Sequence, residues 1–546
     1  MKKILLFALM LINLSSCYKN DLPIADKNED DKISVIGKKL ENPYSLKNMN
    51  KAYINLLRSK GLEKEIPSGN PLCINCTEHP LLLEPTHTYV RILPQDSSHY
   101  DELLNDTNVV MFDYPLDVEI SEGENTVVAE RGTNGFKYLY TKLPVDGYET
   151  PALSGIQLLD SLYIPVELDA SKNPNAPLDE QGNIITKSGA KINFYDILDE
   201  SMRLTGHLNN EIKTKGLFGS KWNPSSTIKA WDNQTNSYIP LKRAKVRARH
   251  LFHWETKYTN NNGFAKFGTF RYGVNYSIAW EGNGWDIRDG IIWQAYYNGP
   301  KLKSHWNLNI RGKKSGHYSM IHRACVRYFH ENIGNIKRPY NFLSKDLKIA
   351  YLDKNNNRAN GYFAPWTTSF PLLQNIALYS TVQGERRTEF EIFSTTIHEI
   401  AHYAHSMHMG GAIQFYQVSN NIGESWARAV QWHLGNIEYS NLNHLLTHNK
   451  LNNIVSTLAI QDWGSKTQNK AYSPLFIDLV ENFNQSIVSA DYPNDNVTGF
   501  TMAQLNNILK KGYGLASLKA ELKKNKPSGV TNIQIDQLFL RYEQLM

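Results

Sequence analysis

The chain has 546 residues and is too long for one compact hydrophobic core, so about three domains are expected. Its formal charge of +6 is small for this length, and the basic residues are scattered rather than gathered into one run, which argues against a nucleic-acid partner. The 30 tyrosines and 11 tryptophans are typical of secreted β-rich domains and of clefts that bind carbohydrates or peptides.

The N-terminus has the order of an export signal. Two lysines precede an apolar run over residues 4–14, which is too short to cross a bilayer. The run ends in Leu-Ser-Ser-Cys at residues 14–17, which resembles the lipobox of bacterial lipoproteins. The resemblance implies that residues 1–17 are a lipoprotein signal peptide and that Cys17 is lipidated. It places the protein at a bacterial outer membrane, facing the periplasm or the cell surface. A plain secretory signal with an incidental cysteine is the alternative.

Residues 18–84 are predicted to be a tether or linker. The segment before residue 45 is rich in Lys, Asn and Asp, including KNEDDK at 27–32, and such a composition favours a solvated chain. Cys73 and Cys76 lie two residues apart, and in an exported protein this pair could close a short disulfide loop. A zinc ribbon would need a second such pair, which the sequence lacks.

Residues 85–215 are predicted to form an N-terminal α/β or β-rich domain. Extended runs at 89–94, 109–120 and 161–169 alternate with turn residues, as expected of strands. PLDVEI at 115–120 resembles a segment of N-terminal domains in Bacteroidetes surface lipoproteins. No chemical motif appears in this interval.

Residues 225–290 are predicted to form a β-sandwich. Apolar and basic residues alternate over 244–249, the period of a half-buried strand. A turn follows in which Gly263 can adopt a positive φ, and a second extended run covers 264–280. PLKRAKVRAR followed by TNNNGFAKFG resembles the transthyretin-like β-sandwich of carboxypeptidase regulatory-like modules. The resemblance implies an accessory module rather than a catalytic one.

Residues 300–546 are predicted to be the catalytic domain. Apolar residues recur at helical spacing over 321–333 and again over 392–409, which indicates two amphipathic or buried helices. Cys325 falls in the first of these runs and is interpreted as a buried small apolar residue.

The second helical run carries an HExxH pattern made by His398, Glu399 and His402. Residues four apart lie on one face of a helix, so the two imidazoles can bind one metal ion. Glu399 lies beside the metal, where it can take a proton from a metal-bound water. The absence of charge over residues 393–397 is expected of a buried helix. The alternative is a structural helix whose histidines hydrogen-bond to their neighbours.

One candidate for the third metal ligand is His408. The metzincin pattern HExxHxxGxxH places a histidine there, but this chain has His405 where that family has the glycine that breaks the helix. A non-glycine residue in the left-handed conformation costs about 1–2 kcal/mol. The glycines at 410–411 come later, so the helix is expected to continue past His405 and to carry His408 away from the ion. His405 is expected to support the ligands or to face solvent.

The rival candidate is Glu424, which stands about twenty residues after the motif. Asn420 or Asn421 could cap a second helix and place Glu424 in its first turn. The arrangement resembles that of gluzincins, in which a helical glutamate follows HExxH at this distance. A simple surface pair of Glu424 with Arg428 is the alternative. We favour Glu424 over His408 as the third ligand.

The gluzincin resemblance implies that His398, His402 and Glu424 bind Zn²⁺ and leave one position open for water. Glu399 would be the general base of a zinc metallopeptidase that cuts protein or peptide substrates outside the cytoplasm. A further donor should stabilise the oxyanion, and the sequence does not choose among its three candidates. These candidates are His433, Tyr439 and Tyr472.

Taken together, the sequence predicts a multidomain protein of Bacteroidetes lipoprotein type. An N-terminal α/β or β-rich domain and a central transthyretin-like β-sandwich precede a mainly α-helical, zincin-type metallopeptidase domain. Two alternatives stay open. One is a metzincin-like peptidase that uses His408 and a methionine turn, for which Met502 is the late candidate. The other is a non-catalytic surface lipoprotein that binds its partner. The pair His444 and His448 lacks a glutamate and is interpreted as surface residues.

Overall fold

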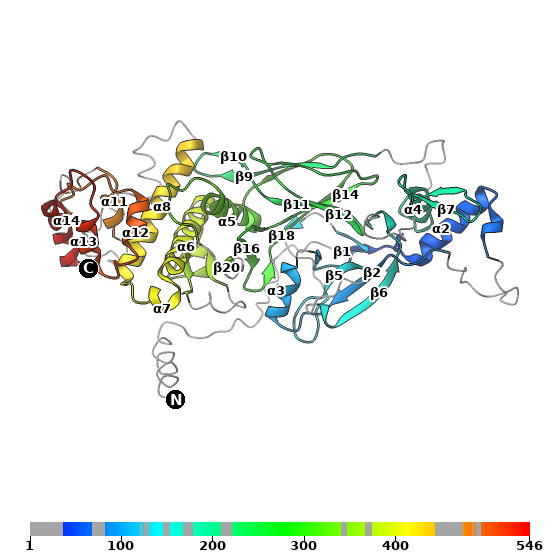
Figure 1. Cartoon of the computed structure of the whole chain (residues 1–546), viewed down its shortest axis with the longest axis horizontal. Helices are drawn as coiled ribbons and strands as arrows, with labels where there is room; N and C mark the ends of the chain where they lie inside the picture. Colours follow the sequence, from blue (N-terminus) through cyan, green and yellow to red (C-terminus); the bar gives the residue numbers. More distant parts are fainter. Residues whose placement is uncertain are drawn as a thin grey trace, which may run out of the picture. The chain divides into compact units, whose positions relative to one another are not determined.

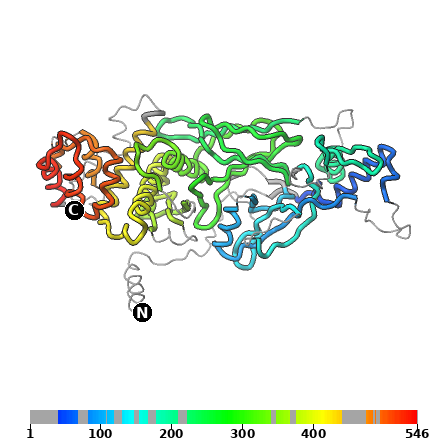
Figure 2. Tube along the Cα trace, in the orientation of Figure 1, coloured from blue at the N-terminus to red at the C-terminus, as the bar shows by residue number. Residues whose placement is uncertain are grey.

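The computed structural model describes most of the chain after residue 35 (Figures 1 and 2). The described residues are 36–67, 82–106, 108–120, 123–124, 130–145, 153–167, 178–208, 221–339, 347–365, 374–442, 473–482, 484, 486 and 493–545. Several predictions fall outside them, namely those for Cys17, Cys73, Cys76, His444, His448 and Tyr472. Within the described residues, no helix is both long enough and apolar enough to cross a membrane.

The N-terminal region mixes helices with a three-stranded antiparallel sheet. Strand β2 (His87–Ile92) lies between β5 (Leu139–Pro144) and β6 (Ile156–Leu162). Three helices and a hairpin accompany the sheet: α2 (Leu46–Ser59), α3 (Ser97–Asn105), α4 (Phe194–Leu204), and β7 (Asn183–Ile185) with β8 (Lys191–Asn193). Helices α2 and α4 pack on each other, so this region has its own core.

Helix α2 corrects the prediction that residues 18–84 are a tether. Its N-terminus is capped by Ser45, whose side chain accepts a hydrogen bond from the Asn48 N–H at 3.2 Å. Met49, Ala52 and Leu57 are fully buried in the core of the N-terminal region. The sequence did not reveal this helix, because charged residues dominate the composition of the interval in which its apolar residues lie.

The central region is β-rich, which confirms that part of the predicted fold. One sheet contains β10 (Ser237–Pro240), β9 (Ser225–Asp232) and β13 (Phe264–Lys266), and β19 (Trp306–Ile310) also pairs with β9. The other contains, in order, β12 (His253–Tyr258), β11 (Lys245–His250), β14 (Val274–Ala279), β18 (Tyr296–Leu302) and β4 (Gly123–Glu124). Buried residues of both sheets share one core.

Gly263 occupies the turn that the sequence predicted, with φ +72°. A Cβ atom there would lie 2.3 Å from the carbonyl oxygen of Ile228, so the turn needs glycine both for its conformation and for the close approach of β9. The identity of this pair of sheets as a transthyretin-like module stays a prediction.

The C-terminal region combines helices with a mixed sheet that sequence analysis did not anticipate. Strand β20 (Leu347–Asn356) runs parallel to both β16 (Trp285–Asp289) and β22 (Ile376–Val382). Strand β21 (Gly361–Phe363) pairs antiparallel with β22 and ends the sheet. Parallel pairing is non-local, and short apolar runs of this kind do not distinguish strands from buried helices.

The C-terminal helices are confirmed. Helix α6 (Glu389–Met409) packs against both α5 (Lys313–His330) and α8 (Asn420–Leu442). Shorter helices complete the region: α7 (Ala412–Phe415), α11 (Leu475–Asp478), α12 (Met502–Ile508), α13 (Leu515–Lys524) and α14 (Asn532–Leu545). Cys325 lies on α5 and is fully buried, as predicted.

The central and C-terminal regions alternate along the chain. Strands β18 and β19 follow the predicted end of the sandwich at residue 290, yet they complete its two sheets. Strand β16 lies before that limit, yet it belongs to the C-terminal sheet. The two regions are therefore interleaved in sequence.

A buried ionic network joins β9, α5 and α8. Arg323 on α5 binds Asp232 of β9 at 2.6 Å and Glu438 of α8 at 2.9 Å. Arg327 binds the same glutamate through its Nε at 2.6 Å, and the Tyr439 phenol donates to Asp232 at 3.1 Å. The network thereby fixes α8 to the central sheets.

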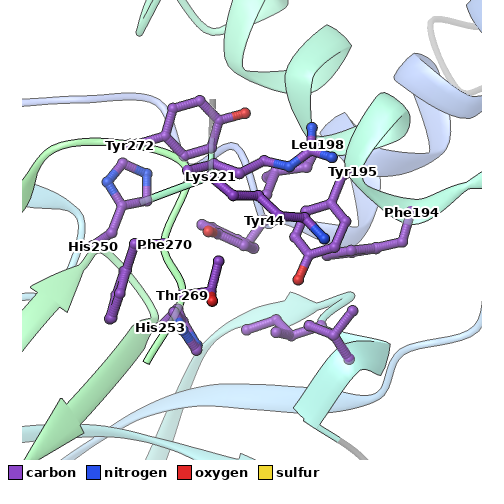
Figure 3. A pocket seen from close by; sticks show the side chains of 13 residues that line it. Tyr44, Phe194, Tyr195, Leu198, Lys221, His250, His253, Thr269, Phe270 and Tyr272 are labelled. Carbon is purple, nitrogen blue, oxygen red and sulfur yellow. The ribbon is translucent and has the colours of Figure 1, made fainter. Parts of the chain in front are cut away.

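An aromatic cavity of about 140 Å³ lies where side chains of the N-terminal region meet the central sheets (Figure 3). Tyr44 and Tyr195 contribute from the N-terminal region, and Tyr272 contributes from the central one. Arg271 lies 4.3 Å from the centre of the Tyr195 ring and binds Asp199 of α4 at 3.1 Å. No three metal-ligating side chains converge there among the described residues.

Leu57→Ala tests whether α2 belongs to the core. Removing this fully buried side chain should lower the free energy of unfolding by about 2–5 kcal/mol, because it leaves a cavity. Urea unfolding followed by tryptophan fluorescence measures the change. The matched variant Lys51→Ala, on the exposed side of the helix, should change stability by less than about 0.5 kcal/mol. Equal stability of the two variants would mean that α2 is a linker helix.

Candidate metal centre

Helix α6 is defined at both ends by local signals. Thr388 and Glu391 form a capping box, in which each side chain accepts a hydrogen bond from the other residue's backbone N–H, at 3.3 and 2.7 Å. Gly410 ends the helix in the left-handed conformation, with φ +95°. Between these points the helix is almost entirely buried, as the uncharged sequence predicted.

The two histidines of the HExxH pattern lie on one face of α6. The Nε2 atoms of His398 and His402 are 3.1 Å apart, and both side chains are largely buried. Residues four apart on a regular helix lie about one turn apart on the same face, so their side chains converge.

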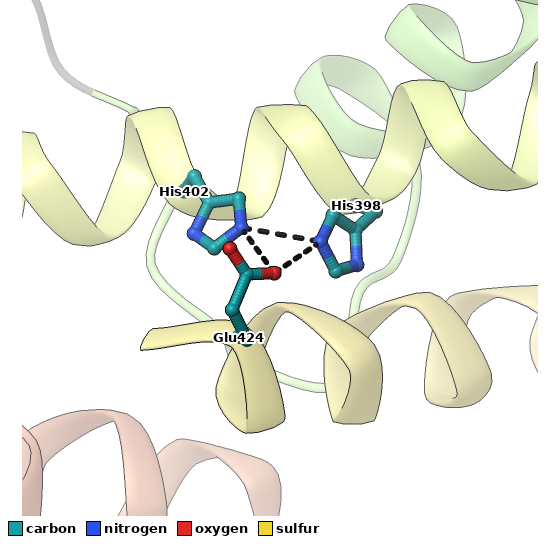
Figure 4. Close-up of side chains that lie close together, drawn as sticks. All are labelled: His398, His402 and Glu424. Atoms are coloured by element: carbon teal, nitrogen blue, oxygen red, sulfur yellow. Dashed lines mark hydrogen bonds and ion pairs between the residues drawn. The ribbon is translucent and has the colours of Figure 1, made fainter. Parts of the chain in front are cut away.

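Helix α8 supplies Glu424 to the same point (Figure 4). Its Oε2 atom lies 3.1 Å from the Nε2 of His398 and 3.2 Å from the Nε2 of His402. The helix begins at Asn420, and the carbonyl of the preceding Ser419 accepts a hydrogen bond from Gly423 N–H. The structure thus brings together the three residues that the sequence singled out as ligands.

The chemistry of this donor set fits a metal ion. Ligands bound tetrahedrally at 2.0–2.1 Å are separated from one another by about 3.3–3.4 Å, close to the three distances observed. Hydrogen bonds alone do not account for all three contacts when Glu424 is ionised. Each imidazole must then carry a proton on Nε2 to donate to the carboxylate, and the two protons would face each other. The three atoms are therefore placed where they could bind one cation.

Glu424 and His402 shift each other's pKa. Burial by itself would raise the pKa of Glu424, but His402 and His398 hold it well below its ordinary range. Burial would likewise lower the pKa of His402, and the carboxylate of Glu424 raises it instead. Without a metal, each of the two groups therefore stabilises the charged form of the other.

Glu399 points into the same site and is 6 % exposed. Burial raises its pKa above the ordinary value for a glutamate, although the neighbouring His398 and His402 act in the opposite direction. A glutamate with a raised pKa is better matched to proton transfer near neutral pH.

A cleft of about 440 Å³ opens beside these residues. Its walls come from β21, from α6, and from a continuous stretch that runs from the end of α7 into the first turn of α8. Glu399, His402 and Glu424 all line it. The cleft therefore brings Glu399 and two of the three predicted ligands to one concave surface.

His408 is not part of the group. Helix α6 continues unbroken through His405, as predicted, and carries His408 to a position where its Nδ1 accepts a hydrogen bond from Asn506 on α12 at 2.9 Å. His405 is buried rather than facing solvent, and its ring contacts Phe415 at 5.3 Å between centroids. Burial lowers the pKa of His405 to about 3.

Of the three candidate oxyanion donors, the structure describes Tyr439 and His433, and neither of them lines the cleft. Tyr439 is fully buried, and its phenol binds Asp232 in the ionic network. His433 is absent from the lining of the cleft. The described phenols that do line it are Tyr362 and Tyr416, which sequence analysis missed. Tyr416 could have been identified from the sequence by its position between the two helices that carry the predicted ligands.

Comparison of the chain with models of known protein families, with curated proteins and with solved structures found no match. The chemistry of the site itself is therefore the basis on which a function is proposed.

Zinc binding to this site should release a proton and weaken as the pH falls. The pKa of His402 is raised in the metal-free protein, so a proton competes with zinc below that pKa. We expect the zinc affinity to fall about tenfold per pH unit in that range and to level off above it. Competition with a chromophoric chelator at a series of pH values measures this, with His408→Ala as a control that keeps the parent profile. A pH-independent affinity would contradict the assignment of His402 as a ligand.

Proposed function

We propose that the protein is a zinc-dependent metallopeptidase that hydrolyses protein or peptide bonds. The observation that carries the proposal is the convergence of His398, His402 and Glu424 at 3.1–3.2 Å beside a buried Glu399 at the edge of a cleft. Two histidines and one glutamate are a known ligand set of catalytic zinc, whereas structural zinc sites usually have four protein ligands.

His398, His402 and Glu424 would hold the ion and leave its fourth position open to the cleft. Zinc bound there would supply a Lewis acid that polarises the substrate carbonyl and lowers the pKa of water. The ligands come from two helices that pack against each other, so their separation depends on the α6–α8 contact.

Glu399 would act as the general base. It takes a proton from the attacking water and passes it to the nitrogen of the leaving amine, so that the carboxylate is regenerated in each cycle. The raised pKa of Glu399 and its place in the lining of the cleft support this role.

The cleft favours an extended polypeptide as substrate. Strand β21 lines the cleft, and among the described strands it pairs with β22 alone. An edge strand offers backbone N–H and C=O groups to an extended chain, which can bind as an additional strand. The scissile bond of such a chain would lie beside Glu399.

Tyr416 is our candidate for stabilising the oxyanion. It is half-exposed in the wall of the cleft, and burial raises its pKa, so the phenol keeps its proton at neutral pH. Tyr362 is the second candidate, and its phenol oxygen accepts a hydrogen bond from Gln374 Nε2 at 3.2 Å.

The place of action is proposed from the sequence. The lipobox resemblance at residues 14–17 supports a protein anchored by lipid at Cys17 to a bacterial outer membrane. Its substrates would then be proteins or peptides of the cell envelope or its surroundings.

Glu399→Gln should abolish peptidase activity while leaving zinc in place. The amide cannot accept the proton of the attacking water, so kcat should fall by about 10²–10⁴. Hydrolysis of a quenched-fluorescence peptide library and zinc content per chain are measured on the same sample. Glu385→Gln, an exposed change on β23 (Glu385–Arg386), serves as the matched control and should keep full activity. Equal hydrolysis by the two variants would refute the role of Glu399.

Tyr416→Phe should lower kcat by about 10²–10³ with little change in KM, because the lost hydroxyl is needed only as charge develops on the oxyanion. Steady-state kinetics on a cleaved peptide measure both constants, and Tyr362→Phe is the comparison. If the second variant loses kcat and the first does not, the oxyanion donor is Tyr362 instead.

A further inference from the structure

A second group of carboxylates lies in the C-terminal region, separate from the HExxH site. Asp478 ends α11, Glu481 follows it in a turn, and Asp495 comes from the segment 493–500. One oxygen from each of the three lies within 4.8 Å of the others. Like charges at this separation repel one another, and the repulsion grows as water is removed.

Two of the three carboxylates are buried, and Glu481 is partly buried. Asp478 is 0 % exposed and Asp495 is 4 % exposed. Burying an ionised carboxylate costs several kcal/mol unless a partner compensates for it. The Tyr542 phenol on α14 donates a hydrogen bond to Asp478, which stabilises one of the charges.

A second, independent observation is a buried carboxylate oxygen of Asp495 that has no hydrogen-bond partner among the described residues. Its Oδ1 accepts a hydrogen bond from Val497 N–H at 3.0 Å, and its own N–H donates to Asn484 Oδ1 at 3.1 Å. These contacts fix the carboxylate while its buried Oδ2 has no hydrogen-bond partner among the described residues. Buried polar atoms in native proteins are nearly always satisfied, by protein, water or an ion.

We propose that Asp478, Glu481 and Asp495 bind a calcium ion. The donors are all oxygens, and carboxylates that can bind through one or both oxygens suit the flexible coordination of Ca²⁺. The set contains no imidazole or thiolate, the donors that zinc prefers. Waters and carbonyl oxygens would complete the coordination sphere.

A calcium ion at this site would stabilise the contact between α11 and the start of α8. Ser473, near the beginning of α11, donates its N–H to Ser425 Oγ at 3.0 Å, and the two hydroxyls lie 2.7 Å apart. Phe476 of α11 packs edge-on against Trp426, with 5.5 Å between ring centroids. Ser425 and Trp426 directly follow Glu424 in the sequence. Calcium would therefore stabilise the segment that contacts the ligand-bearing turn.

Proton sharing is the competing explanation for the group. Burial, together with Asp478 and Glu481, raises the pKa of Asp495, so a proton shared among the carboxylates would relieve the same repulsion. A protonated group and a calcium site differ in their response to added calcium.

The test is calorimetric and thermal titration of the full chain with CaCl₂ after treatment with EGTA. We expect saturable binding of about one Ca²⁺ per chain and a rise in Tm of about 2–5 °C. Asp495→Asn and Glu481→Gln should lose the heat of binding and most of the rise. Asp536→Asn, an exposed acidic residue on α14 outside the group, should keep both. His402→Ala should also keep them, which separates this site from the HExxH site.

The proposal is overturned if CaCl₂ gives no heat of binding and no change in Tm. It is equally overturned if Asp495→Asn responds to CaCl₂ as the parent does. A parent that is indifferent to calcium while Asp495→Asn melts higher would assign the group to proton sharing.

Discussion

Helix α6 continues past His402 to Met409 before Gly410 ends it, and the geometry of the candidate metal centre depends on that continuity. Because the helix does not break at His405, His408 points to Asn506 of α12 and is unavailable to the HExxH pair. The third donor must then come from another element that packs on the same face of α6. Helix α8 meets this requirement, and Glu424 in its first turn lies 3.1–3.2 Å from both imidazoles. The helical conformation of His405 thus distinguishes the two sites that the sequence allowed, one with His408 and one with Glu424 as the third ligand.

The position of α8 depends in turn on regions outside the C-terminal helices. The network of Arg323, Arg327, Asp232 and Glu438 ties it to α5 and to the central sheet, and every member is buried. Breaking one partner of such a network leaves an uncompensated buried charge, which is costly. The strands of the central and C-terminal regions also alternate in sequence, which further ties the helices to the central sheets. In our account the β-rich region is a structural support for the metal centre.

The parts that the sequence predicted well are those set by local geometry. His398 and His402 converge because they are one helical turn apart, and Gly410 ends the helix because glycine tolerates a positive φ. The mixed sheet of the C-terminal region was missed because its parallel strands pair over long distances in sequence. Tyr416 was missed because the cleft wall is assembled from separate elements, and α2 because its buried face lies within a charge-rich interval.

The most direct test of the account is the zinc content of the purified protein and of two variants, measured by mass spectrometry of the metal. We predict about one zinc per chain in the parent and in His408→Ala, and much less in Glu424→Ala. Loss of zinc in His408→Ala with retention in Glu424→Ala would contradict the account, because it would require α6 to break near His405. An absence of zinc from the reconstituted parent would contradict the metal centre altogether.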